Sequence, residues 1–198
     1  MLSELGFSLS AAITALHSAP AEMLAGDLAR AESELRGDYA ALQSMGERMY
    51  TPTVAGMLAE VLHAQGRDEE AGHFSDVCRQ TAAPHDVGAQ YQWRCIRAKL
   101  LAREGRAEEA VALAREGVRL IRGTDQPGIQ GEALAGLAEV LVAAGELEEA
   151  AASLSEAICL FEQKGDTVSA ARSLLLRDRL PVSRTVVGVP RAARPVRR

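Results

Sequence analysis

The stretch GELEEA, residues 145–150, decides the fold: a glycine is followed by acidic residues and then by an alanine. The same pattern recurs as GRAEEA at 105–110, as GRDEEA at 66–71 and, with fewer acids, as GDLARA at 26–31. The glycines of successive copies are 40, 39 and 40 residues apart. A period of this size is typical of a solenoid that is built from helical hairpins.

Two columns of alanine accompany these glycines. One alanine stands seven residues before each glycine, and another stands five residues after it. Because the distance between two helix axes depends on the side chains at the contact, alanine at a fixed place allows a close approach. The columns therefore predict a repeated helix-turn-helix unit. Its structural positions are Gly26, Gly66, Gly105 and Gly145, preceded by Ala19, Ala59, Ala98 and Ala138 and followed by Ala31, Ala71, Ala110 and Ala150.

Each glycine is predicted to end one helix and to begin the turn into the next. Glycine adopts the left-handed conformation that closes a helix without a clash of a Cβ atom. The acids that follow, such as Glu148 and Glu149, then lie in the first turn of the next helix. There each interacts favourably with the helix dipole by about 0.3–1 kcal/mol. We interpret these carboxylates as helix-start residues rather than as catalytic groups.

The repeat pattern covers most of the chain. It predicts one domain at residues 1–180 and a disordered basic tail at 181–198. Within the domain we expect repeats at about 12–50, 51–85, 86–124 and 125–165, and a capping helix at 166–180. The helices are expected at about 7–18, 27–48, 52–65, 67–81, 87–104, 106–122, 127–144, 146–163 and 167–179.

Particular residues are expected to set the helix ends. Pro20 is predicted to interrupt the first helix of the first repeat, because proline lacks an amide donor and clashes with the preceding turn. Short polar side chains that precede helices are expected to cap them. These predicted N-caps are Thr51, Asp86, Asp125 and Asp166.

The spacing of small and large residues resembles that of tetratricopeptide repeats. Gly105 with Ala98, Leu101 and Ala110, and Gly145 with Leu134, Leu137, Ala138, Leu141 and Ala150, carry the resemblance. The resemblance implies an all-α fold, a right-handed α-solenoid with four hairpins. It also implies a non-enzymatic scaffold that binds a peptide or protein segment in a concave groove, which is lined by the first helix of each hairpin.

The same resemblance implies which side chains line the groove. Lys99 and Arg103 would form a basic step between Glu60 and Glu139, and the alternative is a solvated helix face on which they pair with these acids. Tyr91 and Trp93 are expected to pack against the second repeat. The groove positions are Thr53, Gly56, Glu60 and His63, then Gln92, Cys95, Lys99, Ala102 and Arg103, then Glu132, Ala135, Glu139 and Val142.

The stretch from about residue 23 to residue 164 resembles the carboxy-terminal repeat region of large bacterial signalling proteins. Residues 23–48 and residues 97–121 carry this resemblance. Proteins of that kind carry a nucleotide cyclase or regulatory module and an ATPase module before the repeats. The resemblance implies an alternative function as a regulatory or sensor fragment that acts on a cyclase, an AAA ATPase or a transcriptional regulator.

No motif in the sequence indicates catalysis or a cofactor. We find no phosphate-binding loop, no dinucleotide fingerprint and no His-Glu-x-x-His motif. Glu60 and His63 lie three residues apart on one predicted helix, but no third metal ligand accompanies them. Cys78, Cys95 and Cys159 are interpreted as small reduced side chains in a helical interior. We therefore expect no enzyme activity, no metal and no cofactor.

Charge and hydropathy restrict the partners and the location. The net charge is −5, and five arginines beyond Pro181 leave −10 on residues 1–180. An acidic body argues against nucleic-acid binding except through the arginine tail. The apolar faces of the end repeats favour self-association. No signal peptide or membrane span is evident, and reduced cysteines favour the cytoplasm.

Overall fold

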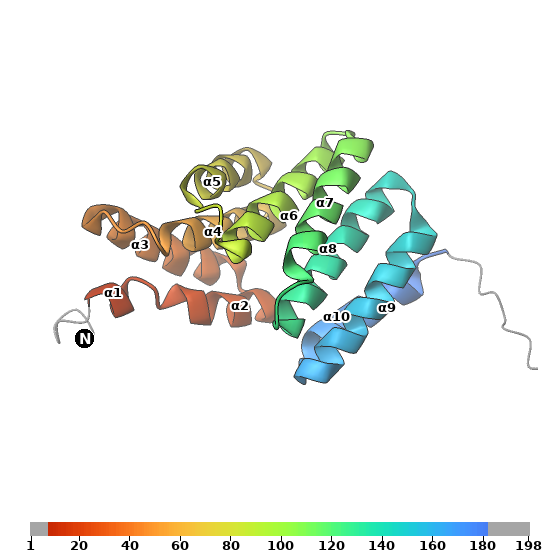
Figure 1. Ribbon diagram of the computed structural model, residues 1–198. Coiled ribbons are helices and arrows are strands. Elements are labelled where there is room, and N and C mark those ends of the chain that lie inside the picture. Colours follow the sequence, from red (N-terminus) through yellow and green to blue (C-terminus); the bar gives the residue numbers. More distant parts are fainter. Residues whose placement is uncertain (1–7, 182–198) are drawn as a thin grey trace, which may run out of the picture.

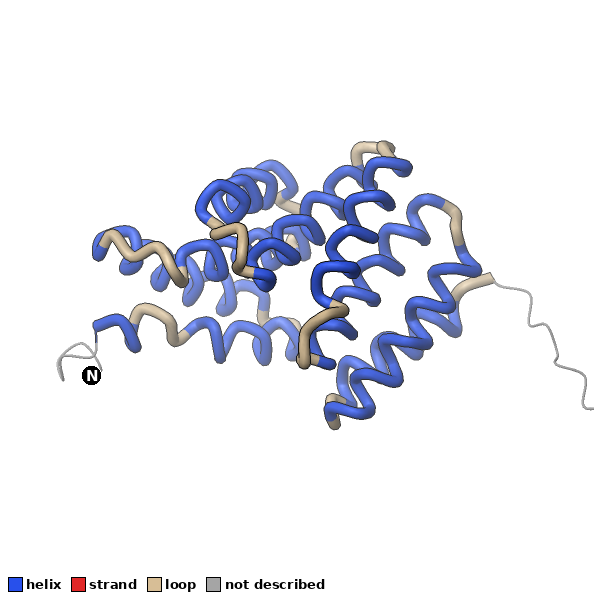
Figure 2. The backbone as a smooth tube through the Cα atoms, viewed as in Figure 1, coloured by secondary structure: helices blue, strands red, loops and turns tan. Residues whose placement is uncertain are grey.

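The computed structural model describes residues 8–181, and this part of the chain consists of helices joined by short turns, with no strand (Figures 1 and 2). The predicted tail, apart from Pro181, lies outside the described residues, as do residues 1–7. The helices are α1 (Ser8–Ala11), α2 (Ala15–Ala25), α3 (Leu28–Met45), α4 (Thr51–Ala64), α5 (Asp68–Thr81), α6 (Val87–Arg103), α7 (Ala107–Ile121), α8 (Pro127–Ala144), α9 (Leu147–Lys164) and α10 (Thr167–Arg179).

The helices form hairpins around the repeat glycines, as the sequence pattern predicts. The four repeat glycines lie in the turns of α2–α3, α4–α5, α6–α7 and α8–α9, with φ angles of 84°, 78°, 79° and 81°. A residue with a Cβ atom adopts this left-handed conformation only at a steric cost. Gly165, at φ 80°, ends α9 in the same way before α10.

The hairpins stack into two layers. Helices α2, α4, α6 and α8 contact one another in succession and form the inner layer, and α3, α5, α7 and α9 form the outer layer. Each outer helix also packs against the inner helix of the next hairpin. Figure 1 shows the stack running from α2 and α3 at one end to α9 and α10 at the other. The all-α solenoid predicted from the sequence is therefore confirmed.

The two alanine columns lie at the contacts between helices. All eight of these alanines have an exposed fraction of 0%. Because their side chains are only methyl groups, the helix backbones approach one another closely where the columns meet. Larger residues such as Leu62, Leu101 and Leu141 fill the space beside them, with exposed fractions of 0%, 5% and 0%.

The buried apolar side chains form two clusters that divide within α6. The first extends from Ala12 to Leu100, and the second extends from Tyr91 to Ala170. Trp93 packs against the first cluster, as predicted, whereas Tyr91 belongs to the second. The prediction for Tyr91 was wrong because residues two apart on a helix point in different directions. Its ring lies against Gly117 of α7, where an added Cβ atom would be 3.5 Å away.

Pro20 does not interrupt its helix, contrary to the prediction. Helix α2 continues through Pro20, whose ring lies on the exposed side of the helix, and the break falls earlier, at residues 12–14. Helix α2 begins at Ala15 because its amide donates a hydrogen bond to the buried carboxylate of Asp38 at 2.7 Å. The start of α2 is therefore set by a side chain from α3.

Two of the four predicted N-caps are confirmed. The carboxylates of Asp86 and Asp166 each accept a hydrogen bond, at 3.0 Å, from an amide in the first turn of the following helix. Thr51 is wrong as a cap because it lies inside α4, where its hydroxyl donates to the carbonyl of Glu47 at 2.6 Å. Asp125 is also wrong, since the residue before α8 is Gln126.

The side chain of Gln130 replaces the expected cap at Asp125. Its amide nitrogen donates to the carbonyl of Thr124 at 2.6 Å, which holds the turn before α8 from within the helix. In the same region of the second hairpin, the Glu47 carboxylate accepts hydrogen bonds from the amides of Met49 and Tyr50 at 2.7 and 2.8 Å. Both turns are therefore stabilised by side chains other than the residue next to the helix.

None of the helices within residues 8–181 combines the length and the apolar character that crossing a bilayer requires.

The buried alanine columns generate a stability prediction. We expect Ala98→Leu to lower the free energy of unfolding by about 1–3 kcal/mol, because the added carbons overfill a contact between helices. Urea unfolding followed by circular dichroism measures this change. Ala112→Leu, at an exposed position of α7, is the matched control and should leave the midpoint nearly unchanged. Equal midpoints for the two variants would contradict the assigned role of the column.

Candidate functional site

The candidate site lies on the inner layer, where glycines of α4 and α8 make room for side chains of α6. A Cβ atom added to Gly56 would collide with Gln92, and one added to Gly136 would lie 2.8 Å from Cys95 Sγ and 3.6 Å from Lys99 Cε. The contacts with Gln92 and with Cys95 Sγ are shorter than those that Cβ atoms make in proteins. Glycine at these two places therefore allows α6 to pack between α4 and α8 with its polar side chains in place.

Lys99 is the basic group of this surface. Its ammonium lies 2.8 Å from Glu139 Oε2 of α8, and its side chain is only 12% exposed. Burial alone would lower the pKa of Lys99, but the carboxylates of Glu139 and Glu60 outweigh that effect and raise the pKa above its ordinary value. The alternative expected from the sequence, a pair between Lys99 and Glu139, is therefore present, and Lys99 stays charged.

Glu132 is the most perturbed acid of this surface. The residue is exposed to solvent, but surrounding protein atoms partly desolvate its carboxylate. This desolvation, with repulsion from Glu60 and Asp166, raises the pKa of Glu132 to about 7, and the positive charge of Lys99 only partly opposes the shift. Within residues 8–181, neither Glu60 nor Glu132 forms an ion pair.

The structure brings together some of the predicted groove residues and separates others. Glu60, Lys99, Glu132 and Glu139 influence one another electrostatically across α4, α6 and α8. Gln92 lies against Gly56 at one end of this group. We call the surface formed by Glu60, Gln92, Lys99, Glu132 and Glu139 the inner face.

His63 and Arg103 do not belong to the inner face. His63 is buried, and its Nδ1 lies 2.9 Å from Asp68 Oδ1. Arg103 Nη1 donates to both carboxylate oxygens of Asp68 at 2.6 and 2.8 Å. The predicted pair of Arg103 with Glu60 or Glu139 was therefore wrong. Arg103 lies in the last turn of α6, where its long side chain reaches the α4–α5 turn instead.

His63 is adapted to this buried position. Burial and the positive charge of Arg103 lower the pKa of His63, although the hydrogen bond that its ring shares with the Asp68 carboxylate opposes the shift. A neutral imidazole is therefore favoured at neutral pH. With the Arg103–Asp68 pair, His63 ties α6 to the hairpin before it.

Asp166 acts on the inner face through its charge, although the sequence predicted it only as an N-cap. It is the N-cap of α10, and its carboxylate accepts from the Ser169 amide at 3.0 Å. The helix-capping pattern was the only sequence signal at this position. Its effect on Glu132 depends on the α8–α9 hairpin, which brings the end of α9, and with it the α9–α10 turn, to the start of α8.

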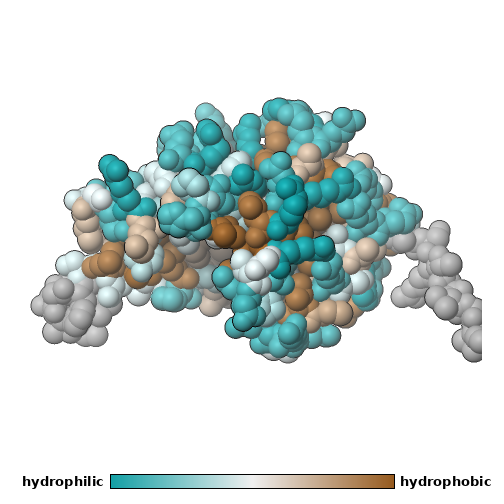
Figure 3. All heavy atoms as spheres, viewed as in Figure 1, coloured by the Kyte–Doolittle hydropathy of each residue, from teal (hydrophilic) through white to brown (hydrophobic). Residues whose placement is uncertain are grey.

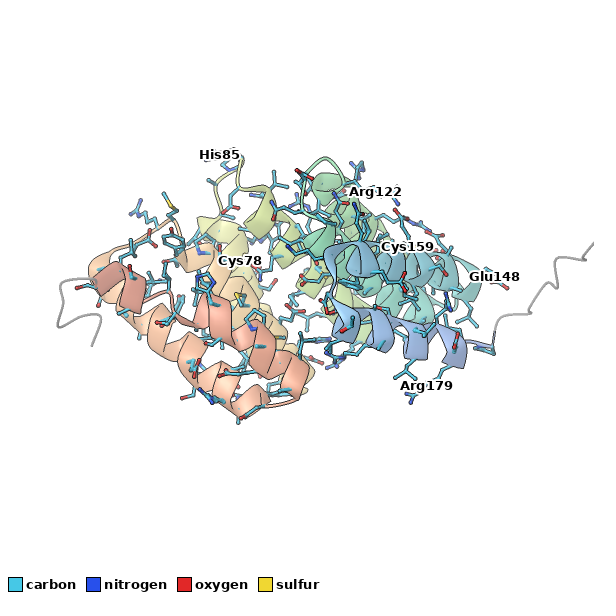
Figure 4. All side chains as sticks on the ribbon, turned by 90° about the horizontal axis from the view of Figure 1, so that it is seen from below. Cys78, His85, Arg122, Glu148, Cys159 and Arg179 are labelled. Carbon is cyan, nitrogen blue, oxygen red and sulfur yellow. The ribbon has the colours of Figure 1, made fainter. Side chains whose placement is uncertain are left out.

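The three cysteines occupy different environments. Burial raises the pKa of Cys78 to about 12 and that of Cys95 to about 11, so both thiols are protonated at neutral pH. Cys159 is exposed on α9, which corrects the expectation that it lies in the interior. Cys78 and Cys159 lie in opposite halves of the molecule (Figure 4), and all three are free.

Over the part of the chain that the structure describes, no three His, Cys, Asp or Glu side chains are grouped so that they could hold a metal ion. Glu60 and His63, which the sequence offered as a pair of metal ligands, lie on one helix, but His63 is hydrogen-bonded to Asp68. Hydrophilic residues cover most of the face shown in Figure 3, and hydrophobic residues are visible near its middle and over the amino-terminal helices at the left.

The stacked hairpins define the class of this protein, a helical-repeat solenoid in which each unit packs against its neighbours. The family model described as "Tetratricopeptide repeat" matches residues 52–72, 92–116 and 131–156, which lie in α4–α5, α6–α7 and α8–α9. The chain belongs to the tetratricopeptide repeat family. Repeats of this family are generally protein–protein interaction modules.

A search of curated proteins found no significant match. The resemblance to bacterial signalling proteins, and the regulatory role that it implies, stay predictions.

The environment of Lys99 generates a second prediction. Lys99→Met leaves the carboxylates of Glu60, Glu132 and Glu139 without their cation, so we expect the free energy of unfolding to fall by about 1–3 kcal/mol at pH 8. The loss should be smaller at pH 5, where protonation of Glu132 relieves the repulsion. Urea unfolding at the two pH values measures the difference. Lys164→Met, at an exposed position of α9, is the control. Equal losses at both pH values would contradict this arrangement of charges.

Proposed function

We propose that the inner face is a groove that binds a protein segment carrying basic side chains. The observation that supports this proposal is the imbalance of charge around Lys99. The ammonium of Lys99 pairs with Glu139, and the negative charges of Glu60, Glu132 and Asp166 act on this surface without a cation of their own in the described residues. A lysine or arginine side chain of a partner would supply the charge that is missing.

The geometry of the inner face favours an extended segment over a small molecule. Glu60 comes from α4, and Glu132 and Glu139 come from α8, so the acids lie on the two inner helices that flank α6 and form a row across the hairpins. A chain that crosses the row can place successive basic side chains beside Glu60 and Glu132. Hydrogen bonds between a charged donor and a carboxylate are the stronger kind, and they also fix the orientation of the segment.

The charge of the whole repeat region supports the same partner. Residues 1–180 carry a net charge of −10. Such a field attracts a basic segment over distances of the order of a Debye length, about 8–10 Å in physiological salt, and raises the rate of association. The long-range field and the local carboxylates therefore both favour a positively charged partner.

Binding of a labelled peptide tests the proposal. We expect a peptide rich in lysine and arginine to bind, and an acidic peptide of equal length to remain unbound, in fluorescence anisotropy at moderate salt. Glu60→Gln and Glu132→Gln should each weaken binding about five- to tenfold, because each removes one charged acceptor. Glu148→Gln is the control, since Glu148 is an exposed acid at the start of the outer helix α9 (Figure 4). Equal effects of the three variants would contradict a site on the inner face.

The raised pKa of Glu132 adds a pH dependence. A cationic ligand favours the ionised carboxylate, and the pKa of about 7 means that Glu132 ionises mainly between pH 6 and 8. The affinity for the basic peptide should therefore increase several-fold over this range. In Glu132→Gln the increase should be largely lost, because the amide does not titrate. An unchanged pH profile in that variant would show that another group is responsible.

A further inference from the structure

Ion pairs at equivalent positions join the outer helices of neighbouring repeats. Arg36 Nη2 of α3 lies 2.9 Å from Glu70 Oε2 of α5, and Arg115 Nη2 of α7 lies 2.7 Å from Glu149 Oε2 of α9. Each arginine stands ten residues after the glycine of its repeat, and each glutamate stands four residues after the glycine of the next. The first and second repeats, and the third and fourth, therefore share the same bridge.

The junction between the second and third repeats lacks this bridge. The position ten residues after Gly66 holds Asp76, and the position four residues after Gly105 holds Glu109. Two acids thus occupy the places where the other junctions have an arginine and a glutamate. Each acid pairs with an arginine of its own hairpin instead: Asp76 with Arg79 at 3.2 Å, and Glu109 with Arg106 at 2.6 Å.

A second bridge of the first junction is also missing at this junction, as it is at the third, where the equivalent positions hold Glu146 and Val111. Between the first and second repeats, Arg67 Nη1 of the α5 N-cap lies 2.8 Å from Glu32 Oε1 of α3. The equivalent positions one repeat later are Arg106 and Gly72. Gly72 has no side chain to offer, and it lines a cleft of about 350 Å³ between α5 and α6.

The packing of the core changes at the same place. The two apolar clusters meet only within α6, where Ile96 and Leu100 belong to the first cluster and Ala98 and Leu101 belong to the second. In Figure 4 the helices coloured red to yellow lie toward one side of the molecule, and those coloured green to blue lie toward the other. Described ion pairs hold α6 on both sides: Arg103 pairs with Asp68 beside the α4–α5 turn, and Lys99 pairs with Glu139 of α8.

We propose that the solenoid bends between its second and third repeats, with α6 as the pivot and the outer helices α5 and α7 moving relative to each other. The other two junctions resist such a movement because an arginine of one outer helix holds a glutamate of the next. Here both equivalent side chains are acids, so they cannot form such a pair with each other. The Arg103–Asp68 pair holds α6 to the second hairpin during the movement.

The bend has a consequence for the inner face, which, unlike the bend itself, rests on the proposed function. Glu60 of α4 lies on one side of the pivot, whereas Glu132 and Glu139 of α8 lie on the other. A change in the angle therefore changes the distance between the carboxylates that a basic segment would contact. The groove would adjust its span to the spacing of the partner's basic residues.

Distance measurements between spin labels on the full chain test the proposal. One label is attached to the native Cys159 on α9 and the other to Ala40→Cys on α3, both at exposed positions. Cys78 and Cys95 react slowly because their thiols stay protonated at neutral pH. Pulsed electron–electron double resonance should show a broad distribution of the distance between these two labels. A label pair within one half, Cys159 with Ala112→Cys, should give a narrow one.

Charge reversal at the junction supplies the decisive comparison. Asp76→Arg and Glu109→Arg each create opposite charges at the two positions, so each should narrow the distribution between α3 and α9. The double variant Asp76→Arg/Glu109→Arg restores like charges and should return the distribution to its original width. Identical widths in all four proteins, or a double variant as narrow as the single ones, would overturn the proposal.

These measurements use no ligand, so they separate the bend from the proposed function. If the distance distributions do not narrow, the bend is contradicted but the peptide-binding proposal is not. If basic peptides do not bind, the proposed function is contradicted but the bend is not. If both hold, Asp76→Arg should also change the peptide spacing that binds best.

Discussion

The close contact between helices at the buried alanines is the constraint on which the rest of the structure depends. Eight alanines at two fixed places in the repeat are fully buried, within a stack in which every hairpin packs against its neighbours. A solenoid has no central core, so its stability is a sum of such contacts between adjacent units. The inner helices can present polar side chains to solvent because the alanine columns on their other sides provide the packing.

Glycine has two separate roles in this chain. At Gly66, Gly105 and the equivalent turns it permits the left-handed conformation that ends a helix. At Gly56 and Gly136, inside helices, it removes a Cβ atom that would collide with Gln92 or Cys95. The first role gives the repeat its period, and the second positions α6 between its neighbours. The polar surface around Lys99 depends on this second role.

The charged residues divide between two faces with different tasks. On the outer face, arginines and glutamates pair across neighbouring repeats at the same register in two of the three junctions. On the inner face, acids outnumber the one lysine that is held among them. Exposed ion pairs contribute little stability individually, about 0–1 kcal/mol. Their distribution therefore matters more for the shape of the stack and for its partners than for folding.

The sequence by itself determined the repeat, the hairpins and the buried columns, because glycine and alanine act through the backbone and through short contacts that recur with the period. Asp86 and Asp166 were predictable as caps for the same local reason. Only the tertiary structure decided which long side chains meet. Arg103 reaches Asp68 rather than the inner face, Tyr91 packs on α7, and Asp166 acts on Glu132. These contacts join residues that are far apart in the chain or depend on helix rotation, and a flexible side chain can reach several neighbours, so spacing alone does not select one.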